Sequence, residues 1–231
     1  MLSNQLSNQL SNQVSNLLPS LIYFFHNMPD VINSWSISMG PLVYLLLFLI
    51  IFSETGLIIL PFLPGDSLLF ALGALAATGN SNLKISFLIL VLPIAALMGD
   101  FLNYNIGRIF GTRVLSSETG IVNKKHLHKT QAFYERHGGK TICLARFVPI
   151  VRTYAPFVAG VGQMSFKKFL SYSVVGAYAW IISFLCLGYF FGNIPTIKTN
   201  FHYVILAIIL ISVLPAVFEY LKSNREGAEL R

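Results

Sequence analysis

The stretch TICLARFVPIVRTYAPFVAGVG, residues 141–162, decides how this chain can fold. It is apolar enough to enter a membrane, yet it contains Arg146 and Arg152 and is interrupted by Pro149 and Pro156. A charge at the bilayer centre costs about 2.5–3.5 kcal/mol on insertion scales, and an interior proline kinks or breaks a helix. We therefore predict a re-entrant helical hairpin, which is tolerated at membrane depth only where protein covers it or where it lines a wet cavity.

A second interrupted stretch lies in the first half of the chain. The sequence PFLPGD at residues 61–66 places two prolines and a glycine before an apolar run that ends at Gly79. We predict a first re-entrant hairpin over 61–79. Four longer apolar segments, each near the roughly 20 residues that a membrane helix needs, predict about four transmembrane helices: 41–60, 84–111, 169–191 and 202–221.

The composition agrees with an all-α integral membrane protein. The 231 residues are 55% hydrophobic and 11% charged, whereas soluble domains carry about 25% charged residues. The net charge of +7 does not indicate nucleic-acid binding, because the basic residues lie between the apolar runs. Cys143 and Cys186 lie in apolar surroundings, and His126 and His128 lack the spacing of metal ligands. We therefore expect no disulfide framework, metal or cofactor.

The domain organisation follows from these segments. Residues 1–16 repeat Leu-Ser-Asn-Gln and predict a disordered low-complexity tail. Residues 17–38, which include Trp35, predict a short interfacial helix. Residues 39–222 form the predicted membrane domain, and 223–231 a cytoplasmic tail.

The two halves of the membrane domain resemble each other. Each has a broken hairpin with charges, a polar turn with lysine, and a long segment that ends in Gly-x-x-x-Gly, at Gly107–Gly111 and Gly188–Gly192. Such glycines allow close helix contact.

The distribution of basic residues orients the halves. Eleven lysines and arginines fall on the side of the 112–140 loop and two on the other, so the loop and the C-terminus are predicted to be cytoplasmic. The eleven are Arg113, Lys124, Lys125, Lys129, Arg136, Lys140, Lys167, Lys168, Lys222, Arg225 and Arg231, and the two are Lys84 and Lys198. The hairpins then enter from opposite faces, an inverted repeat typical of secondary transporters.

Four ionisable residues lie in the membrane-buried, broken sequence: Glu54, Asp66, Arg146 and Arg152. The inverted topology would let them meet near the midplane. Guanidinium groups suit a phosphate, because they offer paired donors in a fixed fork. The acids could carry protons, since burial favours the neutral form of a carboxyl group. The alternative is that all four are structural ion pairs.

A further polar group precedes the 112–140 loop. We expect Asp100 and Arg108 near a helix end at the cytoplasmic interface, where an ion pair or snorkelling is ordinary. Tyr104, Tyr154 and Trp180 are expected to be packing or interface residues rather than ligand contacts.

Three motifs in this order resemble the DedA family of bacterial membrane proteins, whose domain is also called the SNARE-associated or VTT domain. The first is Glu54 followed by PFLPGD at 61–66, and the second is Gly99-Asp100-x-x-x-Tyr104-x-x-Gly107-Arg108-x-x-Gly111. The third is Arg146-Phe-x-Pro149-x-x-Arg152-Thr-x-x-Pro156. The resemblance covers about 40–221.

The resemblance implies lipid translocation, as in bacterial members that flip undecaprenyl phosphate across the plasma membrane in a proton-dependent way. The family's acidic pair falls on Glu54 and Asp66, which implies proton coupling. Its essential arginines fall on Arg146 and Arg152, which implies substrate binding. A secondary motif falls on Asp100, Tyr104 and Arg108.

The functional hypothesis is a proton-coupled flippase for a phosphate-headed polyprenyl lipid in the bacterial inner membrane. Its partners would be the lipid and protons, and a homo-oligomer is a further hypothesis. The alternatives are a proton-coupled transporter of small solutes or drugs, a phospholipid scramblase, and a scaffold that transports nothing. An enzyme is not expected, because no serine, cysteine or histidine is arranged with a base and an orienting group.

Overall fold

The computed structural model describes residues 27–57, 65–79, 81–116, 139–201, 203–204, 206–208 and 210. Throughout these residues the regular structure is helical, with no strand. The predicted tails 1–16 and 223–231 and most of the 112–140 loop lie outside the described residues. The prediction of an all-α chain therefore agrees with the part of the chain that the structure describes.

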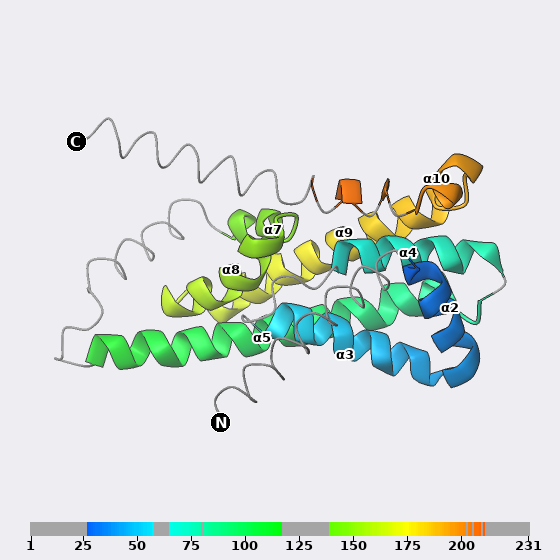
Figure 1. The fold of residues 1–231 in the computed structure, drawn as a ribbon. Helices are drawn as coiled ribbons and strands as arrows, with labels where there is room; N and C mark the ends of the chain where they lie inside the picture. Colours follow the sequence, from blue (N-terminus) through cyan, green and yellow to red (C-terminus); the bar gives the residue numbers. More distant parts are fainter. Residues whose placement is uncertain are drawn as a thin grey trace, which may run out of the picture.

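Two long helices, α5 (Ile85–Ser116) and α9 (Phe166–Phe191), run in opposite directions through the molecule (Figure 1). At 1.5 Å per residue, their 32 and 26 residues extend about 48 and 39 Å. Both lengths exceed the roughly 30 Å hydrocarbon thickness of a bilayer. These are the two described helices that are long and apolar enough to cross a membrane.

The first hairpin consists of α3 (Leu42–Gly56) and α4 (Gly65–Thr78). Its open ends lie together, because the Tyr44 hydroxyl donates to the carbonyl of Asn82 at 3.3 Å and accepts from the backbone N–H of Lys84 at 2.7 Å. The 15 residues of α3 extend only about 22 Å, too short to cross a bilayer.

This geometry corrects two predictions from the sequence. The helix expected over 41–60 is shorter in the structure, since α3 covers Leu42–Gly56 and ends in the interior of the bundle. The expected hairpin over 61–79 is only the returning arm, because α4 is one continuous helix over its 14 residues. Both prolines of the 61–66 motif precede α4, and residues 58–64 lie outside the described residues.

The second hairpin consists of α7 (Lys140–Ala145) and α8 (Pro149–Val161), with a break at residues 146–148. It coincides with the interrupted stretch 141–162. Proline is tolerated at the start of α8, because a first-turn N–H has no partner within the helix. The hairpins occupy opposite halves of the bundle, and their broken ends meet near its middle (Figure 1).

Each long helix packs against one arm of each hairpin: α5 against α3 and α8, and α9 against α4 and α7. The two Gly-x-x-x-Gly motifs lie at equivalent contacts. A Cβ at Gly107 would collide with the backbone of Phe157 on α8, and a Cβ at Gly188 would collide with the backbone of Phe70 on α4. The predicted role of these glycines in close helix packing is confirmed.

The helices at the two ends of the described chain complete the bundle. Within the predicted interfacial segment 17–38, the structure describes α2 (Met28–Met39), which buries Met28 and Ile32 and packs against α3 and α4. After α9 comes the short α10 (Pro195–Thr199), followed by further helical residues up to 210. The predicted last span, 202–221, lies largely outside the described residues.

The molecule is apolar outside and polar in the middle. On α5, Leu90, Phe101 and Ile109 are 57, 50 and 53% exposed, while Asp100 between them is 1% exposed. A water-soluble protein avoids such a continuous apolar surface. This distribution fits a protein whose outer surface faces lipid.

Candidate functional site: two arginine centres at the middle of the bundle

Arg152 lies at the centre of the first polar cluster, which we call the Arg152 centre (Glu54, Asp66, Arg152 and Trp180). From the first turn of α8, its Nη2 donates to Glu54 Oε1 at 2.5 Å and its Nη1 donates to Asp66 Oδ1 at 2.8 Å. Glu54 comes from the last turn of α3 and Asp66 from the first turn of α4. One guanidinium thus joins the broken ends of both hairpins, as the sequence predicted for these three residues.

The two acids are also held by α4 and α9. The backbone N–H of Gly65 donates to Glu54 Oε1 at 3.1 Å, so Glu54 satisfies one of the free N–H groups at the start of α4. A Cβ at Gly65 would collide with the Glu54 carboxylate, so a larger residue at this position would displace the carboxylate from its present place. Trp180 on α9 donates its indole N–H to Asp66 Oδ1 at 2.8 Å.

Trp180 is therefore more than the packing residue that the sequence predicted. Its side chain is fully buried, and the Cζ of Arg152 lies 4.3 Å from the centroid of its ring. This distance is within the range of a cation–π interaction. Trp180 thus contacts both members of the Arg152–Asp66 ion pair.

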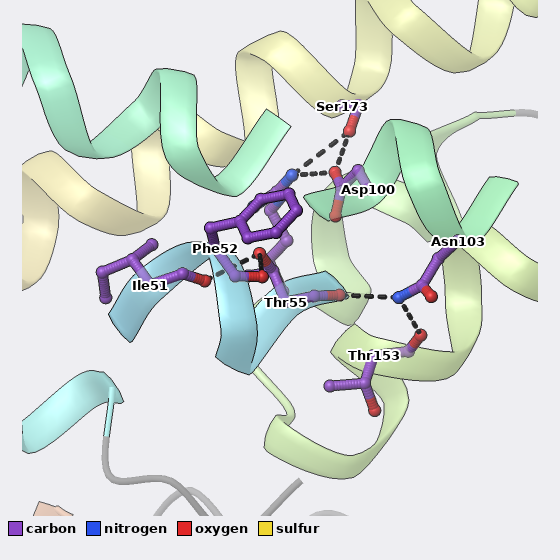
Figure 2. A network of polar contacts seen from close by, with 8 residues as sticks. Ile51, Phe52, Thr55, Asp100, Asn103, Thr153 and Ser173 are labelled. Carbon is purple, nitrogen blue, oxygen red and sulfur yellow. Dashed lines mark hydrogen bonds and ion pairs between the residues drawn. The ribbon is translucent and has the colours of Figure 1, made fainter. Parts of the chain in front are cut away.

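The second cluster, which we call the Arg146 centre, contains Arg146, Asp100 and Ser173. Arg146 follows α7 directly, and its Nη2 forms an ion pair with Asp100 Oδ2 and donates to Ser173 Oγ at 3.2 Å. The Ser173 hydroxyl donates to Asp100 Oδ2 (Figure 2). A Cβ at Gly176 would collide with the Arg146 side chain, so this glycine makes room for the arginine against α9.

Asn103 joins α5 to the broken ends of both hairpins. Its Nδ2 donates to the backbone carbonyl of Thr55, next to Glu54, at 2.6 Å, and to that of Thr153, next to Arg152, at 3.5 Å (Figure 2). A buried carbonyl at a helix break needs such a partner. Asn103 therefore holds in place the backbone that carries two residues of the Arg152 centre.

The described chain has five buried acids and arginines, and all five belong to these two centres. Three are carboxyl groups and two are guanidinium groups, so the fully ionised cluster would carry one excess negative charge. Several of their polar atoms have no hydrogen-bond partner among the described residues: Glu54 Oε2, Arg152 Nε, and Arg146 Nε and Nη1. The cluster is therefore buried and charged, and some of its polar atoms lack hydrogen bonds. Placing such groups within a membrane costs free energy.

The structure corrects the expected place of Asp100. It is not near a helix end, because α5 continues to Ser116 and Asp100 lies near its middle, 1% exposed and paired with Arg146. The sequence suggested that Arg146 would meet Glu54 and Asp66. In the structure its ion pair is with Asp100 instead. The sequence pattern could not separate these alternatives, since each acid has the same chemistry.

The rest of the secondary motif separates into different environments. Tyr104 is buried, stacks on Phe169 with ring centroids 4.3 Å apart, and donates its hydroxyl to the carbonyl of Met164 at 2.5 Å. This confirms a packing role. Arg108 and Tyr154 are exposed, and neither is brought to the arginine centres.

Sequence reasoning did not select Ser173, Asn103 or Gly176. Serine, asparagine and glycine are ordinary in membrane helices, where they mediate helix contacts, so their type alone gives no signal. A helical projection that placed Ser173 and Trp180, seven residues apart, on one face of α9 would have been the available clue.

Comparisons with known proteins agree with this architecture. The VTT domain family matches residues 63–190. The chain is 51% identical to Protein DedA of Escherichia coli strain K12 over 190 residues, which cover 82% of this chain and 87% of that protein. It is 42% identical to an uncharacterized membrane protein of Mycobacterium tuberculosis strain CDC 1551, with 73% and 74% of the two chains covered.

A third relative is more distant. The chain is 30% identical to the inner membrane protein YqjA of Escherichia coli strain K12 over 182 residues, which cover 78% of this chain and 82% of that protein. No solved structure matches the chain. The family match covers more than half of the chain, and the arginine centres are built from residues inside it except for Glu54. The protein is therefore a membrane protein of the DedA family with a VTT domain.

Proposed function

We propose that this protein moves a phosphate-headed polyprenyl lipid, undecaprenyl phosphate, across the bacterial plasma membrane, and that protons drive the movement. The observation that carries the proposal is the pair of buried guanidinium groups at the middle of the bundle, 2 and 3% exposed and held by carboxylates. Guanidinium is the side chain best suited to bind a phosphate through paired hydrogen bonds. The isoprenyl chain would remain in lipid, so only the headgroup needs this polar route.

In this proposal the two hairpins are re-entrant and form an inverted repeat. The arms α3, α4 and α8 each extend about 20–22 Å, less than the bilayer thickness. Their broken ends, which carry Glu54, Asp66 and Arg152, would therefore lie near the midplane. The basic 112–140 loop and the C-terminus would be cytoplasmic.

The charge balance suggests how protons are coupled to the lipid. Both terminal nitrogens of Arg152 already donate to carboxylates, and the ionised cluster has an excess negative charge that repels a phosphate. Protonation of Glu54 or Asp66 removes that charge and frees one side of the guanidinium fork. Phosphate then takes the place of the carboxylate. Loss of the proton on the other side of the membrane restores the ion pair and expels the phosphate.

The proposal is tested with purified protein in liposomes that contain labelled undecaprenyl phosphate. We expect fast transbilayer movement of the label, which an acid-outside pH gradient accelerates. Arg152→Ala should abolish it, while Lys168→Ala, which removes an exposed positive charge, should not. Glu54→Gln combined with Asp66→Asn should make the rate independent of the gradient, because neither amide can take up or release a proton.

The alternatives give different results in the same vesicles. Rapid movement of labelled phosphatidylethanolamine without a gradient would favour a scramblase. Efflux of a cationic dye from vesicles without polyprenyl phosphate would favour a small-solute or drug transporter. Equal rates for the wild type and Arg152→Ala would contradict the proposed role of the arginine.

A further inference from the structure

Trp180 contacts the Arg152 centre in two ways that involve different chemistry. Its indole N–H donates to Asp66 Oδ1, the same oxygen that accepts from Arg152 Nη1. Its ring faces the Arg152 guanidinium at 4.3 Å. The side chain is fully buried in the middle of α9, so these contacts are not displaced by water.

The hydrogen bond and the ring contact favour the same state of the centre. An N–H that donates to a carboxylate stabilises its ionised form, and an aromatic face stabilises a cation above it. Both contacts therefore stabilise the ion pair between Asp66 and Arg152. In the proposed cycle, this is the state that must open before a phosphate can bind to the guanidinium.

We propose that Trp180 is a positioning residue that sets the pH at which Asp66 takes up a proton and releases Arg152 to the phosphate. This inference rests on the proposed function. The other charged groups that face Asp66 are Glu54 from α3 and Arg152 from α8. The Asp100–Arg146 pair, from α5 and the end of α7, is the neighbouring charge pair. The acid of α2, Asp30, is exposed and lines a cavity beside Thr78, at the opposite end of α4.

The protein offers a direct optical test that needs no lipid substrate. It has two tryptophans, so Trp35→Phe leaves Trp180 as the only one. In this background we expect the emission of Trp180 to change with pH in a single transition, because the indole N–H loses a charged acceptor when Asp66 is protonated. Asp66→Asn should abolish the transition, and Asp100→Asn should keep it. Emission that is independent of pH, or a transition that survives Asp66→Asn, would overturn the proposal.

The second test uses transport. Trp180→Phe keeps an aromatic ring over Arg152 and removes only the N–H donor. We expect the pH profile of lipid movement to shift upward by about one pH unit, the size expected for a hydrogen bond to a charged acceptor. Trp180→Leu removes the ring contact as well and should give a larger upward shift. An unshifted profile in Trp180→Phe would contradict the role.

The two tests separate this inference from the proposed function. If the liposomes show no lipid movement but Trp180 still reports the protonation of Asp66, the positioning role stands and the substrate is different. If lipid moves and the emission of Trp180 does not change with pH, the flippase stands and the role of Trp180 is wrong. The optical test uses a variant that keeps Trp180, so it remains valid even if both Trp180 variants fail to fold.

Discussion

The two arginine centres contain similar residues, but their arginines differ in how many guanidinium nitrogens have a hydrogen-bond partner. Arg152 meets two carboxylates and an aromatic ring, and only its Nε lacks a partner among the described residues. Arg146 meets one carboxylate and one serine, and both its Nε and its Nη1 lack a partner. The Arg152 centre is therefore closed by excess negative charge, while the Arg146 centre keeps free donors.

This difference suggests that Arg146 and Arg152 have different roles. Arg146 can donate to a phosphate oxygen without breaking its ion pair, because its Nε and Nη1 have no hydrogen-bond partner among the described residues. On Arg152 only Nε has no partner among the described residues, so both of its terminal nitrogens become available to a phosphate only after the carboxylates leave. In the proposed cycle, Arg146 attracts the headgroup and Arg152 couples its movement to protons. Four predictions test the comparison, from the largest expected effect to the smallest.

The largest effect is expected from the removal of each arginine. Arg152→Ala leaves two buried carboxylates without their cation, and breaking a buried ion pair costs about 3–5 kcal/mol. Arg146→Ala leaves one carboxylate, which keeps its bond from Ser173. We expect Arg152→Ala to lower the midpoint of thermal unfolding in nanodiscs more than Arg146→Ala, with Lys168→Ala as control. The opposite order would remove the distinction between the centres.

A double replacement separates structural from functional roles in the Arg146 centre. Asp100→Leu alone leaves a buried guanidinium and should destabilise the protein by several kcal/mol. Asp100→Leu with Arg146→Met replaces the whole pair by apolar side chains and should return the stability to within about 1 kcal/mol of the wild type. Lipid movement should still fall at least about tenfold, which corresponds to about 1.4 kcal/mol of lost binding. Recovery of both properties would show that the pair is purely structural.

Substitutions at the two glycine contacts should destabilise the protein by similar amounts, unlike substitutions in the two arginine centres. Gly107→Ala and Gly188→Ala both place a methyl group against a backbone of the opposing helix. Overpacking of this kind costs about 1–3 kcal/mol, and we expect similar losses at the two sites. Leu187→Ala, next to Gly188 on the exposed surface of α9, is the matched control and should cost less. Thermal unfolding of the three variants measures the difference, and strongly unequal glycine effects would argue against the equivalence of the two halves.

The smallest effect is expected at Ser173. Its hydroxyl donates to Asp100 and accepts from Arg146, and a hydrogen bond of this kind contributes about 1.5–3 kcal/mol when one partner is charged. Ser173→Ala leaves the ion pair in place, so we expect a loss near the lower end of that range. Ser173→Thr, which keeps the hydroxyl, should lose less. A loss as large as that of Asp100→Leu would mean that the serine, not the ion pair, holds this centre together.

The sequence predicted the parts of this protein that depend on local chemistry. Charges within apolar runs identified Glu54, Asp66, Arg146 and Arg152 as buried, because no other arrangement is tolerable in lipid. The interrupted stretch 141–162 predicted the second hairpin, and the Gly-x-x-x-Gly motifs predicted the close contacts. These features need only the identity and spacing of neighbouring residues.

The tertiary structure alone decided which charges meet. The sequence could not show that α3 stops at Gly56, that Asp100 lies deep in the bundle opposite Arg146, or that Trp180 contacts both Asp66 and Arg152. Apolar periodicity is the same for a spanning helix and for a hairpin arm, since lipid and protein interior are equally apolar. Partners in an ion pair are chosen by the packing of helices that lie far apart in the sequence. For this protein, composition and spacing determined that the charges are buried together, and the contacts among α4, α5, α8 and α9 determined how they are paired.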